Sequence, residues 1–247
     1  MPTAPSLRSE SADACAGAGP SLTIKGIYMK FDSLIFDIDG TLWDSTGTIA
    51  RAWSDASGRF MFGRKHFTKQ QVMNEVGRPL DVIFRDLYPE IGELEKTDAD
   101  QAAAVLREIN EISTEFEYNY LRRYGAELYP GVADTLKALA AEIPLFIVSN
   151  CEKGYIEIMT EASGLTPLFK DWLCFGDTLL EKDRTMQVLI GRHHLQKTAY
   201  VGDILNDALS SEKANVPFIW ASYGFGEVDP AHYSERIDCF ADLMKLV

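Results

Sequence analysis

Five short apolar segments recur along the chain, each beside a segment whose apolar residues follow helical spacing. They span residues 31–37, 144–149, 172–175, 198–202 and 217–221. Short runs that are apolar at nearly every position are typical of strands buried on both faces of a parallel sheet. Because such strands alternate with helices here, the pattern predicts an α/β fold with a doubly wound parallel sheet.

A long helical stretch separates the first of these strands from the second. Residues 45–129 contain no comparable strand pattern. The longest helix expected there covers about residues 98–124 and carries apolar side chains at steps of three and four, which predicts one buried face. These side chains are Val105, Ile109, Ile112, Phe116 and Tyr120.

The chain is therefore expected to have three parts. Residues 29–44 and 130–247 are predicted to form the α/β core domain, and residues 45–129 an inserted, all-helical cap domain. Pro130 and Gly131 mark the end of the insertion, because both residues break helices. Residues 1–28 are rich in Ala, Ser, Gly and Pro, and we interpret them as a disordered leader or an extension foreign to the native protein.

Composition and charge restrict the expected partners. The net charge of −13 disfavours binding to a nucleic-acid backbone or to an anionic membrane surface. The four cysteines lie far apart, so neither a disulfide framework nor a zinc site is indicated. No segment approaches the roughly 20 apolar residues of a membrane span. We expect a cytoplasmic protein that is a monomer or a homodimer.

The candidate chemistry begins directly after the first strand, in the segment Asp37-Ile38-Asp39-Gly40-Thr41. Two carboxylates stand two residues apart and precede a tight turn that glycine permits. An acidic turn without function is the simpler interpretation. The pattern favours an active site because further polar residues follow later strands, at the edge where open α/β sheets bind their ligands.

Three further polar elements follow in order along the chain. Ser149 and Asn150 come after the second strand and precede a helix whose free N–H groups can hold a phosphate. Lys182 comes next, followed by Asp203 at a strand end and Asp207 one turn into the next helix. Taken singly, Ser149-Asn150 is also compatible with a helix cap, and Lys182 with an exposed lysine.

These carboxylates would crowd several negative charges into one pocket. The residues are Asp37, Asp39, Asp203 and Asp207. Such a cluster stays ionised only if cations compensate it, and a divalent metal together with Lys182 would do so. Because the oxygen ligands include no His or Cys, they favour Mg²⁺, which shares its coordination shell with a substrate phosphate.

Together, the Asp-Ile-Asp-Gly-Thr motif, Ser149-Asn150, Lys182 and the Gly202-Asp203-x-x-x-Asp207 pattern resemble the haloacid dehalogenase superfamily. The resemblance covers about residues 31–247. It implies a Rossmann-like core, and the insertion is similar to the helical cap of the phosphoglycolate phosphatase and β-phosphoglucomutase-like branch. It further implies that Asp37 attacks phosphorus and forms an aspartyl-phosphate, while Asp39 acts as general acid and then as general base.

The resemblance also implies roles for the other motif residues. The phosphate-binding residues would be Thr41, Ser149, Asn150 and Lys182. The Mg²⁺ ligands would be the Asp37 carboxylate, the Asp39 backbone carbonyl and Asp203, with Asp207 in a supporting position. Many relatives have Pro after the motif lysine, whereas Asp183 follows Lys182 here. Lys153 is therefore a second candidate for the lysine.

Two residues near the insertion are candidates for substrate specificity. Arg78 lies in a Gly-x-Pro turn, from which it would reach an anionic leaving group. An exposed arginine at a helix entry is an equally good interpretation. Trp43 directly follows the first motif and is expected to contact substrate.

The predicted activity is hydrolysis of a small phosphorylated metabolite, similar to that of the phosphoglycolate phosphatases. A phosphomutase of the β-phosphoglucomutase type is the nearest alternative, because it uses the same aspartyl-phosphate. A non-catalytic phosphate-binding protein is a third possibility. The Thr in the first motif favours the phosphatase over the mutase, whose relatives often depart from Thr at that position.

Overall fold

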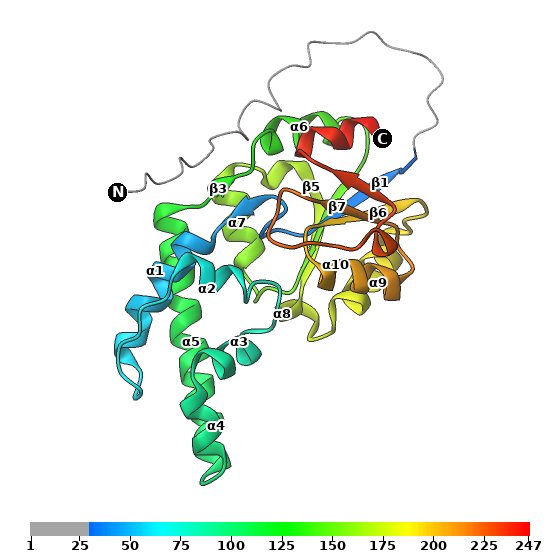
Figure 1. Cartoon of the computed structure of the whole chain (residues 1–247). Helices are drawn as coiled ribbons and strands as arrows, with labels where there is room; N and C mark the ends of the chain where they lie inside the picture. Colours follow the sequence, from blue (N-terminus) through cyan, green and yellow to red (C-terminus); the bar gives the residue numbers. More distant parts are fainter. Residues whose placement is uncertain (1–29) are drawn as a thin grey trace, which may run out of the picture.

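A six-stranded parallel sheet forms the centre of the computed structural model, which describes residues 30–247 (Figure 1). The leader predicted for residues 1–28 lies outside the described residues. The strand order is β5-β4-β1-β6-β7-β8, with every neighbouring pair parallel. The strands are β1 (Ser33–Phe36), β4 (Leu145–Ser149), β5 (Phe169–Cys174), β6 (Thr198–Gly202), β7 (Phe218–Ala221) and β8 (Glu235–Ile237). The predicted doubly wound α/β sheet is confirmed.

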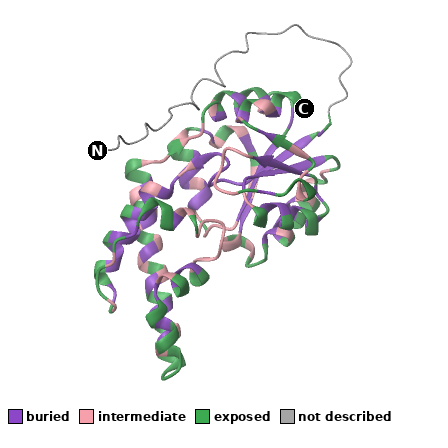
Figure 2. Ribbon diagram, viewed as in Figure 1, coloured by how far each residue is buried: buried purple, intermediate pink, exposed green. Residues whose placement is uncertain are grey.

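Alternate residues of each strand supply two different cores. Leu34 and Phe36 of β1 belong to a cluster that continues into the helical insertion, whereas Ile35 between them belongs to a separate cluster on the opposite face. This alternation follows from the two-residue period of a strand. Buried residues accordingly fill the four inner strands, β1, β4, β6 and β7, in Figure 2.

Helices cover both faces of the sheet. α6 (Val132–Ala140) and α7 (Tyr155–Ser163) carry apolar side chains of the first cluster, while α9 (Lys182–His193) and α10 (Leu205–Ala214) carry those of the second. The remaining helical segments of this part are α8 (Phe175–Thr178), η2 (Thr166–Leu168), η3 (Pro230–His232) and η4 (Phe240–Lys245). Within residues 30–247, no helix is both long and apolar enough to cross a membrane.

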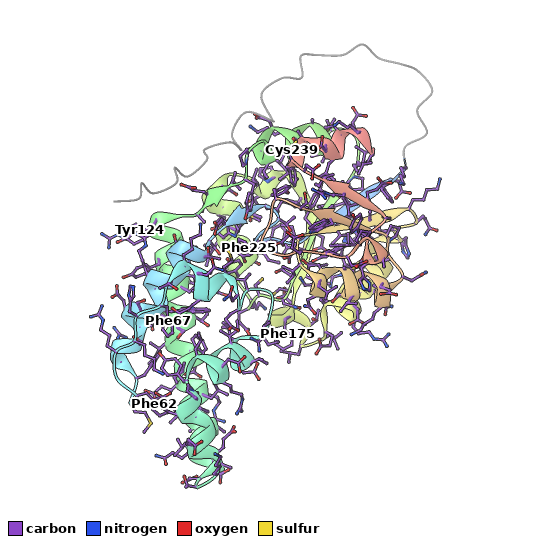
Figure 3. All side chains as sticks on the ribbon, in the orientation of Figure 1. Phe62, Phe67, Tyr124, Phe175, Phe225 and Cys239 are labelled. Carbon is purple, nitrogen blue, oxygen red and sulfur yellow. The ribbon has the colours of Figure 1, made fainter. Side chains whose placement is uncertain are left out.

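The insertion consists of helices and projects from one end of the sheet (Figure 1). Its helices are α1 (Thr46–Ala56), η1 (Ser57–Arg59), α2 (Lys69–Met73), α3 (Leu80–Leu87), α4 (Pro89–Glu95) and α5 (Ala99–Tyr124). Their apolar faces meet around Trp53, which packs edge-on against Phe67, labelled in Figure 3. The chain enters through β2 (Trp43–Asp44) and leaves through β3 (Glu127–Leu128), which pair antiparallel. The segments by which the chain enters and leaves the insertion thus lie side by side, next to the predicted domain boundaries.

Two details differ from the sequence predictions. Strand β8 was not predicted, because a three-residue edge strand with the sequence Glu-Arg-Ile has no apolar run. On α5, Ile112, Phe116 and Tyr120 are only partly buried, and the buried row continues from Ile109 as Ser113, Glu117 and Leu121. The second half of α5 contacts both α1 and α7, so its buried face includes polar residues that line the site described next.

Candidate active site

Three strand ends meet where the strand order reverses. β1 lies between β4 and β6, and Asp37, Ser149 and Asp203 stand at or just after the carboxyl ends of these strands. This is the topological switch point, where open α/β sheets bind their ligands. The structure therefore brings together residues that are separated by more than a hundred positions in the sequence.

Lys182 links two of the carboxylates. Its Nζ donates to Oδ1 of Asp37 at 3.1 Å and to Oδ1 of Asp207 at 2.6 Å. Burial alone would lower the pKa of Lys182, but the two carboxylates raise it overall, so the ammonium stays charged. Burial raises the pKa of Asp37 to about 6, against the opposing effect of Lys182. The lysine lies where the motif order predicts it.

The alternative lysine is far less suitable. The Lys153 side chain is 77% exposed and lies 3.9 Å from Asp177, whereas that of Lys182 is 1% exposed. Lys182 is the first residue of α9, so the following Asp183 occupies the first helical turn. A carboxylate is favourable there, because the helix dipole is positive at that end. The start of α9 therefore accommodates Asp183 directly after Lys182.

Asp203 is held from several sides. Thr41 donates its hydroxyl to Oδ1 at 3.1 Å, and the Phe225 amide donates to Oδ2 at 2.8 Å. Gly40 and Gly224 both contact this side chain so closely that a Cβ at either position would collide with it. Phe225, labelled in Figure 3, belongs to the glycine-rich loop after β7, which thus contributes to the site through its backbone.

The acidic cluster has the composition expected of a divalent-cation site. Carboxylate oxygens of Asp37, Asp203 and Asp207 lie within 4.8 Å of one another. Burial, reinforced by the charges of Asp207 and Asp37, raises the pKa of Asp203 well above its usual value. When all three groups are ionised, the single ammonium of Lys182 leaves two negative charges, which one divalent ion would neutralise. An all-oxygen ligand set suits Mg²⁺.

Asp39 is held by three donors on one oxygen. Its Oδ1 accepts from the Trp43 indole at 2.9 Å, from the Tyr155 hydroxyl at 2.8 Å and from the Ser45 hydroxyl. Burial raises the pKa of Asp39 to about 7, while the hydrogen bonds from Ser45 and Tyr155 oppose the rise. A carboxyl group with such a pKa can give and take a proton near neutral pH.

The second strand's polar residues lie beside Asp37. Ser149 lines a pocket that also contains Asp37 and Asp39. Its hydrogen bond opposes the rise in the pKa of Asp37. Asn150 lines the pocket too and donates from Nδ2 to the Gly77 carbonyl at 2.9 Å. Gly77 belongs to the insertion, so this bond joins the two parts of the molecule.

The insertion closes the other side of the pocket. Its contribution comes from α1, from α3 and the loop before it, and from α5, and includes Trp53, Arg78, Thr114, Glu117 and Tyr118. The space left for the centres of water-sized molecules is about 70 Å³. A single water needs about 10–15 Å³ on this measure, so the pocket suits a small ligand.

A match to a family model shows to which protein family the chain belongs. A model of the family described as haloacid dehalogenase-like hydrolase matches residues 34–221, which is most of the chain. The chain belongs to this family. The predicted superfamily and the prediction of a hydrolase are thereby confirmed.

Several relatives cover nearly the whole of this haloacid dehalogenase-like hydrolase. A phosphoglycolate phosphatase of Vibrio vulnificus is 29% identical over 223 residues, covering 87% of this chain and 95% of the relative. One from Yersinia pestis is 27% identical and covers 89% and 94%. A crystal structure described as a predicted phosphoglycolate phosphatase, from Haemophilus somnus, has a TM-score of 0.73 at 25% identity and covers 88% and 98%.

A more distant neighbour shows the fold alone. CbbY from Rhodobacter sphaeroides, solved in complex with xylulose-(1,5)bisphosphate, has a TM-score of 0.68 at 18% identity. It covers 86% of this hydrolase and 96% of its own chain.

Three residues predicted to contact ligand make other contacts in this hydrolase. Trp43 is 1% exposed and directs its indole N–H to Asp39. Arg78 lines the pocket, but its guanidinium donates to Glu75 and, at 2.7 Å, to Asp86. Thr41 also uses its hydroxyl internally, on Asp203.

Sequence reasoning missed several residues of the site. Ser45 makes no side-chain cap bond at the start of α1 and instead donates its hydroxyl to Asp39. Tyr155 and Glu117 belong to no sequence motif, and an isolated polar or aromatic residue on a helix does not indicate a site. Buried polar positions on α5 and α7 become recognisable only when the two helices face each other across the pocket.

Proposed function

We propose that this protein is a Mg²⁺-dependent phosphatase that hydrolyses small phosphomonoesters through a phosphorylated Asp37. The observation that carries the proposal is the buried cluster at the end of β1, where Asp37 meets Lys182 and two further carboxylates. The relatives named phosphoglycolate phosphatase support the same chemistry. The domain division at residues 44/45 and 129/130 is part of this proposal, with the helical insertion as the cap.

Asp37 is the nucleophile in this mechanism. Its carboxylate attacks phosphorus and displaces the leaving-group oxygen, which takes a proton from Asp39. Water then attacks the aspartyl-phosphate, giving its proton to Asp39 and releasing phosphate, so that both side chains return to their starting states. The pKa of about 7 for Asp39 suits a group that serves as acid in one step and as base in the next.

The remaining core residues compensate and orient charge. Lys182 neutralises the phosphoryl oxygens and Asp37, and Ser149 and Asn150 donate hydrogen bonds to the same oxygens. The residues fit a Mg²⁺ ion held by Asp37, Asp203 and the Asp39 carbonyl, with Asp207 in support. Bound Mg²⁺ supplies positive charge to the phosphoryl group as negative charge develops. Thr41 acts indirectly in this scheme, by holding Asp203.

The cofactor and partner assignments follow from the same site. The cofactor is Mg²⁺, and the partner is a small phosphorylated metabolite that fits the pocket between cap and core. The net charge of −13 is again consistent with a ligand that local cations hold, and not with nucleic acid.

The test is phosphate release from a panel of phosphorylated metabolites that includes phosphoglycolate, measured with Mg²⁺ and with chelator. We expect release that needs Mg²⁺ and falls on the order of 10³-fold or more in Asp37→Asn, which removes the attacking oxygen. Asp134→Asn is the matched control, because the Asp134 side chain is 94% exposed.

Two results would contradict the proposal. Release that survives Asp37→Asn would exclude the aspartyl-phosphate. Conversion of a sugar phosphate into its isomer without free phosphate would instead support the phosphomutase.

A further inference from the structure

Beyond the phosphoryl site, the pocket carries two further acidic side chains, one from the cap and one from the core. Glu117 from α5 and Glu152 from the loop before α7 both line the pocket, in addition to Asp37 and Asp39. Burial raises the pKa of Glu152, with a further contribution from the charge of Asp81. A second anion on the substrate would therefore enter a region that is already acidic.

The cationic side chain that lines the pocket, Arg78, is already paired with carboxylates. Among the described pocket-lining residues, Arg78 is the one with a positive charge. Glu75 and Asp86 both pair with its guanidinium, the latter at 2.7 Å. A substrate carboxylate would have to compete with Glu75 and Asp86 for Arg78, whose side chain is 38% exposed.

Glu117 is placed to bind a cation or a hydrogen-bond donor. The residue is 7% exposed, and within residues 30–247 its side chain has one hydrogen-bond donor, the Trp53 indole at 2.9 Å to Oε2. A carboxylate accepts up to four hydrogen bonds, so it has capacity left toward the pocket.

Aromatic rings surround the same space. Trp53, Tyr118 and Tyr155 line the pocket together with Glu117, and the two tyrosine rings lie 6.3 Å apart. Aromatic faces attract organic cations, and the attraction is stronger where water is excluded. A carboxylate among aromatic rings is thus a suitable site for an alkylammonium group.

We propose that Glu117 and the rings of Trp53, Tyr118 and Tyr155 select phosphomonoesters whose leaving group carries a protonated amine in place of a second anion. The inference rests on the phosphatase function proposed above and narrows its substrate class. It departs from the activity named for the relatives, which are at most 29% identical in the comparisons described.

The protonation of Glu117 is compatible with this role. Burial raises its pKa to about 8, so the empty pocket holds it mainly as the neutral acid at pH 7. An ammonium within about 4–6 Å lowers a carboxyl pKa by about 1–3 units, which ionises the group as the amine binds. A substrate carboxylate has the opposite effect and gains no ion pair.

Three two-carbon esters of similar size test the proposal. They are 2-aminoethyl phosphate, 2-hydroxyethyl phosphate and phosphoglycolate, whose leaving groups carry an ammonium, a hydroxyl and a carboxylate. We expect kcat/KM to be at least about tenfold higher for the aminoethyl ester than for phosphoglycolate at pH 7. Glu117→Gln, which keeps an acceptor for Trp53, should lower the aminoethyl-to-hydroxyethyl ratio about tenfold.

A matched control separates this effect from a structural one. Glu115→Gln removes the same charge from an exposed position of α5 and should leave rates and ratios unchanged. Equal losses on all three esters in Glu117→Gln would overturn the proposal, since they indicate a structural role. So would faster hydrolysis of phosphoglycolate that Arg78→Ala abolishes.

A fourth substrate distinguishes failure of this inference from failure of the phosphatase proposal. Mg²⁺-dependent hydrolysis of 4-nitrophenyl phosphate without preference for the amine refutes the specificity alone. If none of the four esters releases phosphate, the phosphatase function itself is contradicted, and the proposed specificity is refuted as well.

Discussion

The two walls of the active site differ in how fully their charges are compensated. On the core wall, Lys182 bridges Asp37 and Asp207, and the remaining acidic excess matches one divalent ion. On the cap wall, Glu117 has only a neutral indole as donor among the described residues, and Arg78 is already bound by two carboxylates.

This difference suggests separate tasks for the two walls. A phosphoryl group is the same in every phosphomonoester, so the core can compensate it with a fixed set of charges. The leaving group varies, and an acidic wall without a free cation discriminates between leaving groups by their charge. The core wall would thus determine the reaction and the cap wall the substrate.

The largest expected effect comes from removing the cation of the core wall. Lys182→Met keeps a side chain of similar length but leaves Asp37 and Asp207 buried without their partner. We expect a loss of about 3–5 kcal/mol in the free energy of unfolding and of at least about 10³-fold in kcat/KM. Urea unfolding and phosphate release measure the two losses.

Lys153→Met serves as the control, because that side chain is 77% exposed. If Lys182→Met retained a tenth of the activity, the core wall would not depend on this ammonium.

A smaller effect is expected where the two walls touch. Gly77 has a φ of 90°, and a Cβ there would lie 2.6 Å from Cδ1 of Ile204. Gly77→Ala should therefore hinder docking of the cap loop on the core and raise KM about tenfold. Adding Ile204→Val removes the colliding methyl group and should restore part of the affinity.

The comparison for this variant is Gly92→Ala, since nothing lies within 4 Å of a Cβ at that position. An unchanged KM in Gly77→Ala would mean that the contact does not limit substrate binding.

The smallest effect is a shift of the pH profile. Tyr155→Phe removes the hydroxyl that donates to Asp39 at 2.8 Å. This hydrogen bond stabilises the carboxylate, so its loss should raise the Asp39 pKa further above about 7, by roughly half a unit to one unit. The first step needs protonated Asp39, and activity should therefore persist to higher pH in the variant.

The measurement is kcat/KM against pH, with Tyr124→Phe as the control at a half-exposed position. A shift to lower pH would show that Tyr155 does not act on Asp39 in this way.

Much of the core could be predicted from the sequence. The strands buried on both faces are runs of apolar residues, and this local pattern is enough to identify them and the α/β class. The order of Asp37, Ser149, Lys182 and Asp203 was informative because Asp37, Ser149 and Asp203 lie at or just after the carboxyl ends of strands. Lys182, at the start of α9, was identified by its place in that order. Strand β8 was not predicted, because an edge strand does not need a run of apolar residues.

The cap wall required the tertiary structure. Glu117 became a pocket residue because α5 turns a polar row toward α7, and the apolar spacing of the helix pointed to a different face. Arg78 looked available in the sequence, but its charge is taken by Asp86, eight residues later. The pair with Glu75 is local, at a spacing of three residues, whereas the contact with Asp86 depends on the course of the chain from the loop into α3.

The sequence by itself determined the apolar strands, the inserted helices and the acidic residues available for phosphoryl chemistry, because these follow from local periodicity and short motifs. Only the tertiary structure decided which charges remain uncompensated. Charge compensation depends on distances between residues such as Asp39 and Tyr155, which are 116 positions apart in the chain. Burial then sets how strongly each remaining charge acts, and burial is a property of the assembled fold.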